Sequence, residues 1–183
     1  MFILGIILIL LGSVIIYKKS FLCKYEFFNF IFLLLTLLTS ISFEQIRAKI
    51  AFIIVMFVFG LLLHYDYGDK VIVKGKYIVF NLPPNDILDI LSKILKEQQI
   101  NHNVHKNSII IEEEKNKWTI KVKPKVFDLT SLYLTDIYNT PLYKLIVEKL
   151  NSSLKGYKTK PFSKLGLILT AWGLMFAMIY LFS

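Results

Sequence analysis

Four long stretches of this chain contain no Asp, Glu, Lys or Arg, and the polar block 66–160 separates the third stretch from the fourth. Each stretch is close to the length, about 17–25 residues, that a helix needs to cross a bilayer. Hydrocarbon tolerates almost no unpaired charge. The pattern therefore predicts an integral membrane protein with four short transmembrane helices, at about 1–17, 27–43, 48–65 and 162–183.

The polar block 66–160 predicts a soluble α+β domain inserted before the fourth span. Lys70–Leu82 is rich in Val, Ile, Tyr and Phe and predicts one or two strands, broken at Gly75. Pro83–Asp86 then predicts a helix start, because proline suits the first turn and an acidic residue favours its dipole. The helix should end near Gln99. Its apolar positions are Ile87, Leu88, Leu91, Ile94 and Leu95, and its polar positions are Asp89, Lys93, Lys96 and Glu97.

The second half of the block predicts more strands and a second helix. After a turn at Asn101–Asn103, Ser108–Glu113 and Trp118–Val122 should form a hairpin, and Leu129–Ile137 is also β-like. Thr140 and Pro141 predict a capped helix start. One apolar stripe follows: Leu142, Ile146, Leu150 and Leu154. We expect two helices covering one face of a mostly antiparallel sheet.

Lysines near the helix ends predict the orientation. They cluster between the first two spans and at both ends of the block 66–160, which the positive-inside rule assigns to the cytoplasm. Both termini would then lie outside. The first stretch is expected to remain as a helix rather than to be a signal peptide, because its basic residues follow the apolar run and no cleavage site is visible.

Motifs for chemistry are missing from the sequence. There is no G-x-S-x-G, and the few glycines within 66–160 form no phosphate-binding loop. Cys23, the single cysteine, excludes an intrachain disulfide and a thiolate-rich metal site. His102 and His105, with Glu112–Glu114, could in principle hold a divalent metal, but exposed loop histidines explain them as well. We therefore assign no catalytic, cofactor or metal residues and expect no enzyme.

The strongest candidate surface is a basic strand. Lys117, Lys121, Lys123 and Lys125, with Trp118, could contact anionic lipid headgroups or an acidic protein. The alternative is an edge strand protected from aggregation by its lysines. The net charge of +9 is spread along the chain, so nucleic acid is not an expected partner.

Small residues in the first and last stretches predict close helix packing. Gly5 and Gly12 share one side of the first helix, and Gly173-x-x-x-Ala177 fits the small-x-x-x-small pattern. These residues could pack helices within one chain or form a dimer seam.

The sequence thus favours a non-enzymatic integral membrane protein whose cytoplasmic domain binds a protein partner or the anionic membrane surface. The alternative hypothesis is a small membrane transporter or a membrane-embedded enzyme acting as a homo-oligomer.

Overall fold

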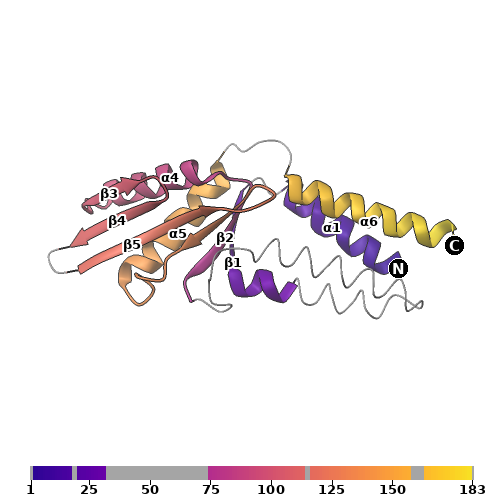
Figure 1. Ribbon diagram of the computed structural model, residues 1–183, viewed down its shortest axis with the longest axis horizontal. Coiled ribbons are helices and arrows are strands. Elements are labelled where there is room, and N and C mark those ends of the chain that lie inside the picture. Colours follow the sequence, from indigo (N-terminus) through magenta and orange to yellow (C-terminus); the bar gives the residue numbers. More distant parts are fainter. Residues whose placement is uncertain (1, 18–19, 32–73, 114–115, 158–162, 183) are drawn as a thin grey trace. The chain divides into compact units, whose positions relative to one another are not determined.

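The computed structural model describes residues 2–17, 20–31, 74–113, 116–157 and 163–182. Its helices and strands are shown in Figure 1. In chain order they are α1 (Phe2–Tyr17), β1 (Phe21–Lys24), β2 (Lys76–Phe80), α4 (Pro84–Glu97), β3 (His102–His105), β4 (Ser108–Glu113), β5 (Asn116–Pro124), β6 (Leu129–Tyr133), α5 (Pro141–Gly156) and α6 (Lys164–Phe182). Residues 25–31 are helical as well.

The chain divides into two compact units. The first comprises Met1–Lys18, Glu26–Gly68 and Pro161–Ser183, and the second comprises Lys19–Tyr25 and Asp69–Lys160.

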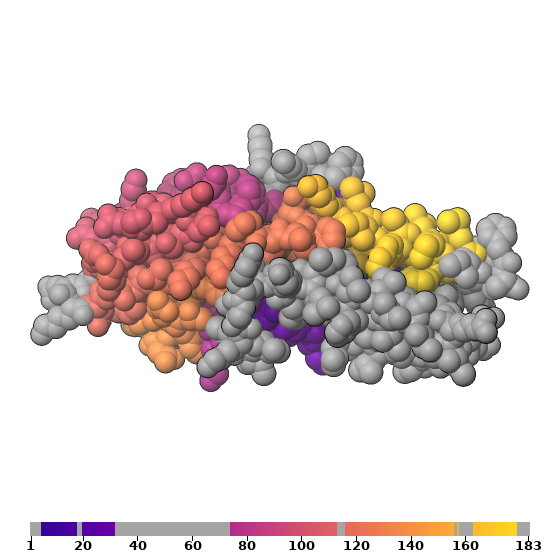
Figure 2. All heavy atoms as spheres, in the orientation of Figure 1, coloured from indigo at the N-terminus to yellow at the C-terminus, as the bar shows by residue number. Residues whose placement is uncertain are grey.

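The second unit is an α+β domain built on one antiparallel sheet. Its six strands lie in the order β1-β2-β6-β5-β4-β3, and every neighbouring pair is antiparallel. Helices α4 and α5 pack with the sheet around a single apolar core. In Figure 2 the atoms of α4 and of strands β3, β4 and β5 lie against one another as one packed surface. The predicted α+β architecture with an antiparallel sheet is therefore confirmed for this unit.

Alternation along the strands decides which side chains enter the core. Val79, Val122 and Leu132 point to the helices and are fully buried, together with Ile109, Ile111 and Ile120. The predicted apolar stripes of both helices meet them, and Leu91 and Leu150 have no exposed surface. Burying an aliphatic side chain of this size stabilises the fold by about 1.5–3 kcal/mol.

Helix starts follow the proline signals, although the predicted threonine cap is not formed. Pro84 and Pro141 open α4 and α5. Thr140 occupies the N-cap position of α5, but its side chain makes no capping hydrogen bond. Its hydroxyl instead donates to the carbonyl of Ile137 at 2.7 Å. This contact closes the turn that follows β6, so the β-like run ends at Tyr133 rather than at Ile137.

Two strands were not predicted. β1 lies in the presumed loop between the first two spans, yet it pairs with β2, and the Phe21 ring stacks on Phe80 at 4.2 Å. β3 covers most of the predicted turn and pairs with β4. The chain turns on either side of it, with positive φ at Gln99 and a turn at residues 106–107. Both strands depend on a neighbouring strand, which a local pattern does not reveal.

In the first unit, α1 and α6 run antiparallel and pack closely at their glycines. A Cβ atom on Gly173 would lie 2.6 Å from the Gly5 carbonyl oxygen, and one on Gly12 would lie 2.7 Å from the Gly166 carbonyl oxygen. Only residues without a side chain permit this approach. The structure thus places these small residues at a helix contact within one chain, as the first of the two interpretations expected.

The prediction of membrane-spanning helices is wrong for the residues that the structure describes: none of their helices is both long enough and apolar enough to cross a membrane. α1 has 16 residues, which at about 1.5 Å per residue is shorter than a hydrocarbon core of about 30 Å. α6 begins at Lys164 and has 19 residues. Most of the spans predicted at 27–43 and 48–65 lies outside the described residues.

This finding also overturns the predicted orientation of the chain in a membrane. The multi-pass placement, with both termini outside and residues 66–160 in the cytoplasm, depended on the spans, as did the lipid bilayer and its anionic headgroups as partners. The tethered partner-binding module, the transporter and the membrane-embedded homo-oligomer depended on them too. The physical reason is that a charge-free run identifies a helix that is apolar on all sides, and such a helix can also pack against other protein segments.

Candidate functional site

The five residues predicted as a contact surface do not share one face of the sheet. Lys117, Lys121 and Lys123 lie on the face away from α4 and α5, whereas Trp118 lies on the helix face and packs against the core. Lys117 is also paired with Glu112 across the hairpin, at 3.1 Å. A binding role for these five residues stays a prediction, but they do not form one surface.

Three lysines, Lys76, Lys123 and Lys125, lie over two tyrosine rings. The Nζ atom of Lys76 lies 4.0 Å from the centre of the Tyr25 ring and 4.9 Å from that of Tyr133. Lys123 lies over the Tyr133 ring at 5.4 Å, and Lys125 over the Tyr25 ring at 5.7 Å. These are cation–π contacts within the unit. The edge-strand interpretation is wrong for Lys121, which pairs with both β4 and β6. Lys117 pairs with β4 alone and Lys123 with β6 alone, although β5 lies between these two strands in the sheet.

His102 has a structural role in the second unit. Its Nδ1 atom is 2.8 Å from the Ile100 carbonyl oxygen and must donate to it, because a carbonyl only accepts. Its Nε2 atom is 2.9 Å from the Ser92 hydroxyl of α4. Both ring nitrogens are therefore engaged, and the contact with Ser92 ties β3 to α4. Within the described residues, no group of three or more His, Cys, Asp or Glu side chains could hold a metal ion.

Cys23 lies on β1 and is half-buried. Burial raises the pKa of its thiol. A raised pKa lowers the fraction of nucleophilic thiolate at neutral pH. Cys23 is therefore a poor candidate for a reactive group.

A groove between α4 and α5 is a candidate site in the described part of the chain. Its volume is about 560 Å³. Helix α4 contributes Ile90, Lys93, Ile94 and Glu97. Helix α5 contributes Lys149, Ser152 and Ser153, and Tyr157 follows the end of that helix. Because α4 and α5 are anchored on the same core, the two walls of the groove are held by the folded sheet.

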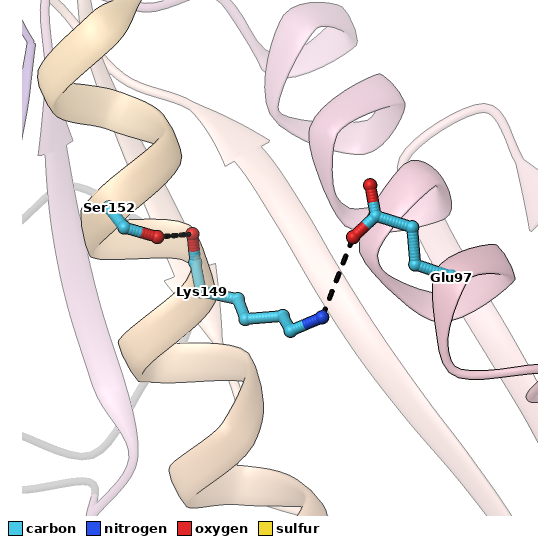
Figure 3. A network of polar contacts seen from close by, with 3 residues as sticks. All are labelled: Glu97, Lys149 and Ser152. Carbon is cyan, nitrogen blue, oxygen red and sulfur yellow. Dashed lines mark hydrogen bonds and ion pairs between the residues drawn. The ribbon is translucent and has the colours of Figure 1, made fainter.

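Polar and apolar groups are separated within the groove. Ile90 and Ile94 are buried and form its apolar floor. Above them, Lys149 reaches across from α5 toward Glu97 on α4, as Figure 3 shows, and its Nζ atom is 3.5 Å from Glu97 Oε2. The Ser152 hydroxyl donates to the Lys149 carbonyl at 2.8 Å. The groove therefore offers apolar contact below and charged groups at its rim.

Tyr157 lies at one end of the groove, beside the first turn of α4. Burial raises the pKa of its phenol, and the carboxylates of Asp86, to which it is hydrogen-bonded, and Asp89 raise it further. The phenol is therefore protonated at neutral pH. It joins the chain after α5 to the start of α4.

Comparison with known proteins adds no assignment. No protein-family model matches the chain, and no curated protein matches it. The groove is therefore interpreted from its own residues.

Sequence reasoning missed the groove. It assigned Lys93 and Glu97 correctly to the polar side of the first helix, where solvent was the expected neighbour. The α5 residues that line the other wall lie about 50 residues further along the chain, and no local pattern sets the spacing of two helices on a sheet. The one available signal was that Lys149 borders the apolar stripe of its own helix.

Proposed function

We infer that the second unit is a small-molecule-binding domain whose site is the groove between α4 and α5. The observation that carries this proposal is a groove with a buried apolar floor, a charged rim and two walls from one packed core. Sites for small molecules in proteins are concave, mostly apolar and about 300–1,000 Å³ in volume, with a few polar groups that orient the ligand. The groove has a volume in this range, two isoleucines at its base and a few polar groups at its rim.

The test uses the full-length protein with isotope-labelled isoleucine methyl groups. Hexan-1-ol, hexanoate and hexylamine share one apolar chain and differ only in the charge of the head group. At least one of them should shift the methyl signals of Ile90 and Ile94 in a saturable way. If none of the three shifts these signals, the proposed function is wrong.

A matched pair of variants locates the binding. Ser153→Trp places an indole in the groove and should abolish the saturable shifts. Asn151→Trp carries the same substitution on an exposed position of α5 outside the groove, and it should bind as the wild type does. Equal binding by both variants would place the ligand elsewhere.

A further inference from the structure

Resting on the proposed function, we propose that the groove selects a small organic monoanion, with its carboxylate held by Lys93 and Lys149 and its apolar body on Ile90 and Ile94. Three features of the lining residues support it.

The first feature is the charge balance. The groove is lined by two lysines, Lys93 and Lys149, and by one carboxylate, Glu97. Among the residues that the structure describes, Lys149 is paired with Glu97, and no ion pair is formed by Lys93. The carboxylates of Asp86 and Asp89 lie beside Tyr157 at one end of the groove, but among the lining residues themselves one positive charge is in excess. An anion entering there gains a favourable interaction that a neutral or cationic ligand lacks.

The second feature is the weakness of the ion pair. Lys149 and Glu97 are separated by 3.5 Å, and their side chains are 38% and 50% exposed. Such a pair is screened by water and holds its partners loosely. A ligand carboxylate can therefore replace Glu97 at Lys149, while Glu97 turns to solvent. The ammonium group remains paired throughout.

The third feature is the floor. Ile94 is 3% exposed and Ile90 is 9% exposed, and both border the empty volume. Apolar surface at the base of a groove is covered favourably by the hydrocarbon part of a ligand. The two isoleucines expose little surface themselves, so a hydrocarbon chain also lies along the aliphatic stems of Lys93 and Lys149 beside them. The preferred ligand therefore carries both a carboxylate and a short hydrocarbon chain.

The experiment compares the three six-carbon probes on the full-length protein at constant ionic strength, by the Ile90 and Ile94 methyl shifts. Hexanoate should bind about tenfold more tightly than hexan-1-ol, because charged hydrogen bonds are the stronger ones. Hexylamine should bind most weakly. Equal affinities for hexanoate and hexan-1-ol, or tightest binding of hexylamine, would overturn the anion selectivity and leave the proposed function standing. Failure of all three probes to bind would instead overturn the proposed function.

Three variants assign the head group to its partners. Lys93→Met should weaken hexanoate binding about threefold or more and leave hexan-1-ol unchanged, since only the charged contact is lost. Lys96→Met is the control, because Lys96 lies on the same helix but does not line the groove. Glu97→Gln should strengthen hexanoate binding by removing the competing carboxylate. Unchanged hexanoate affinity in both Lys93→Met and Glu97→Gln would contradict the proposed head-group site.

Discussion

A hydrogen bond between two tyrosine hydroxyls joins α5 to the sheet. The hydroxyl oxygens of Tyr77 on β2 and Tyr143 on α5 are 2.6 Å apart, in a part-buried hydrogen bond. The ring of Tyr138 meets the Tyr143 ring edge-on at 4.9 Å. Tyr143 therefore contributes through its hydroxyl, which bonds to Tyr77, whereas Tyr138 contributes through its ring.

Replacing Tyr143 by Phe should lower the free energy of unfolding by about 1 kcal/mol, because one hydrogen bond is lost while the ring packing remains. Urea unfolding of the full chain measures this change. Tyr138→Phe is the control and should change the free energy by less than about 0.5 kcal/mol. A loss from Tyr138→Phe as large as that from Tyr143→Phe would contradict the assigned hydrogen bond.

The raised pKa of Tyr157 predicts a pH dependence of stability. Its neutral form is favoured in the folded state by burial and by Asp86. The unfolded phenol ionises at about pH 10, so the associated stability is present below that pH and is lost as the pH rises through the higher folded pKa. Urea unfolding between pH 8 and 11 should therefore show wild type losing stability relative to Tyr157→Phe. A constant difference between the two proteins would contradict the shift.

At the scale of the elements, the sequence predicted those features that depend on neighbouring residues in the chain, namely helix starts and buried helix positions. Prolines placed the starts of α4 and α5, and the 3.6-residue spacing identified the buried positions Leu91 and Leu150. The pairing of β1 with β2 joins segments about 55 residues apart, and neither short strand has a strong pattern of its own. The groove depends on the same kind of distant relationship, since α4 and α5 supply one wall each.

The contact between α1 and α6 should be sensitive to a single methyl group. Gly173→Ala gains up to about 1 kcal/mol of helix propensity, but its Cβ would lie 2.6 Å from the Gly5 carbonyl oxygen and 2.7 Å from the Ile9 backbone nitrogen. Overpacking of this kind costs about 1–3 kcal/mol, so a net loss of stability is expected.

Thermal unfolding followed by Trp172 fluorescence, in a Trp118→Phe background, measures that loss, because the chain has only these 2 tryptophans. Leu174→Ala is the control, since Leu174 is an exposed residue of α6. It should leave the melting temperature nearly unchanged. An unchanged or higher melting temperature for Gly173→Ala would mean that the two helices are not closely packed.

At the scale of the whole molecule, the sequence contrasted apolar stretches with one polar block. The polar block indeed contains most of the α+β unit, because alternating and helical apolar patterns report directly on burial. The prediction of membrane spans failed for α1 and α6. A helix without charged residues can pack against lipid or against other protein segments, and the absence of charge does not distinguish the two. The second unit also recruits Lys19–Tyr25 from between two of those stretches.

The central claim is that the groove between α4 and α5 holds a small ligand. The most direct measurement is the set of nuclear Overhauser effects between the hydrocarbon chain of bound hexanoate and the methyl groups of the full-length protein. Contacts with Ile90 and Ile94 are predicted, and none with Val104 or Val126, which are exposed elsewhere on the unit. Contacts with those valines, or none with the two isoleucines, would contradict the account.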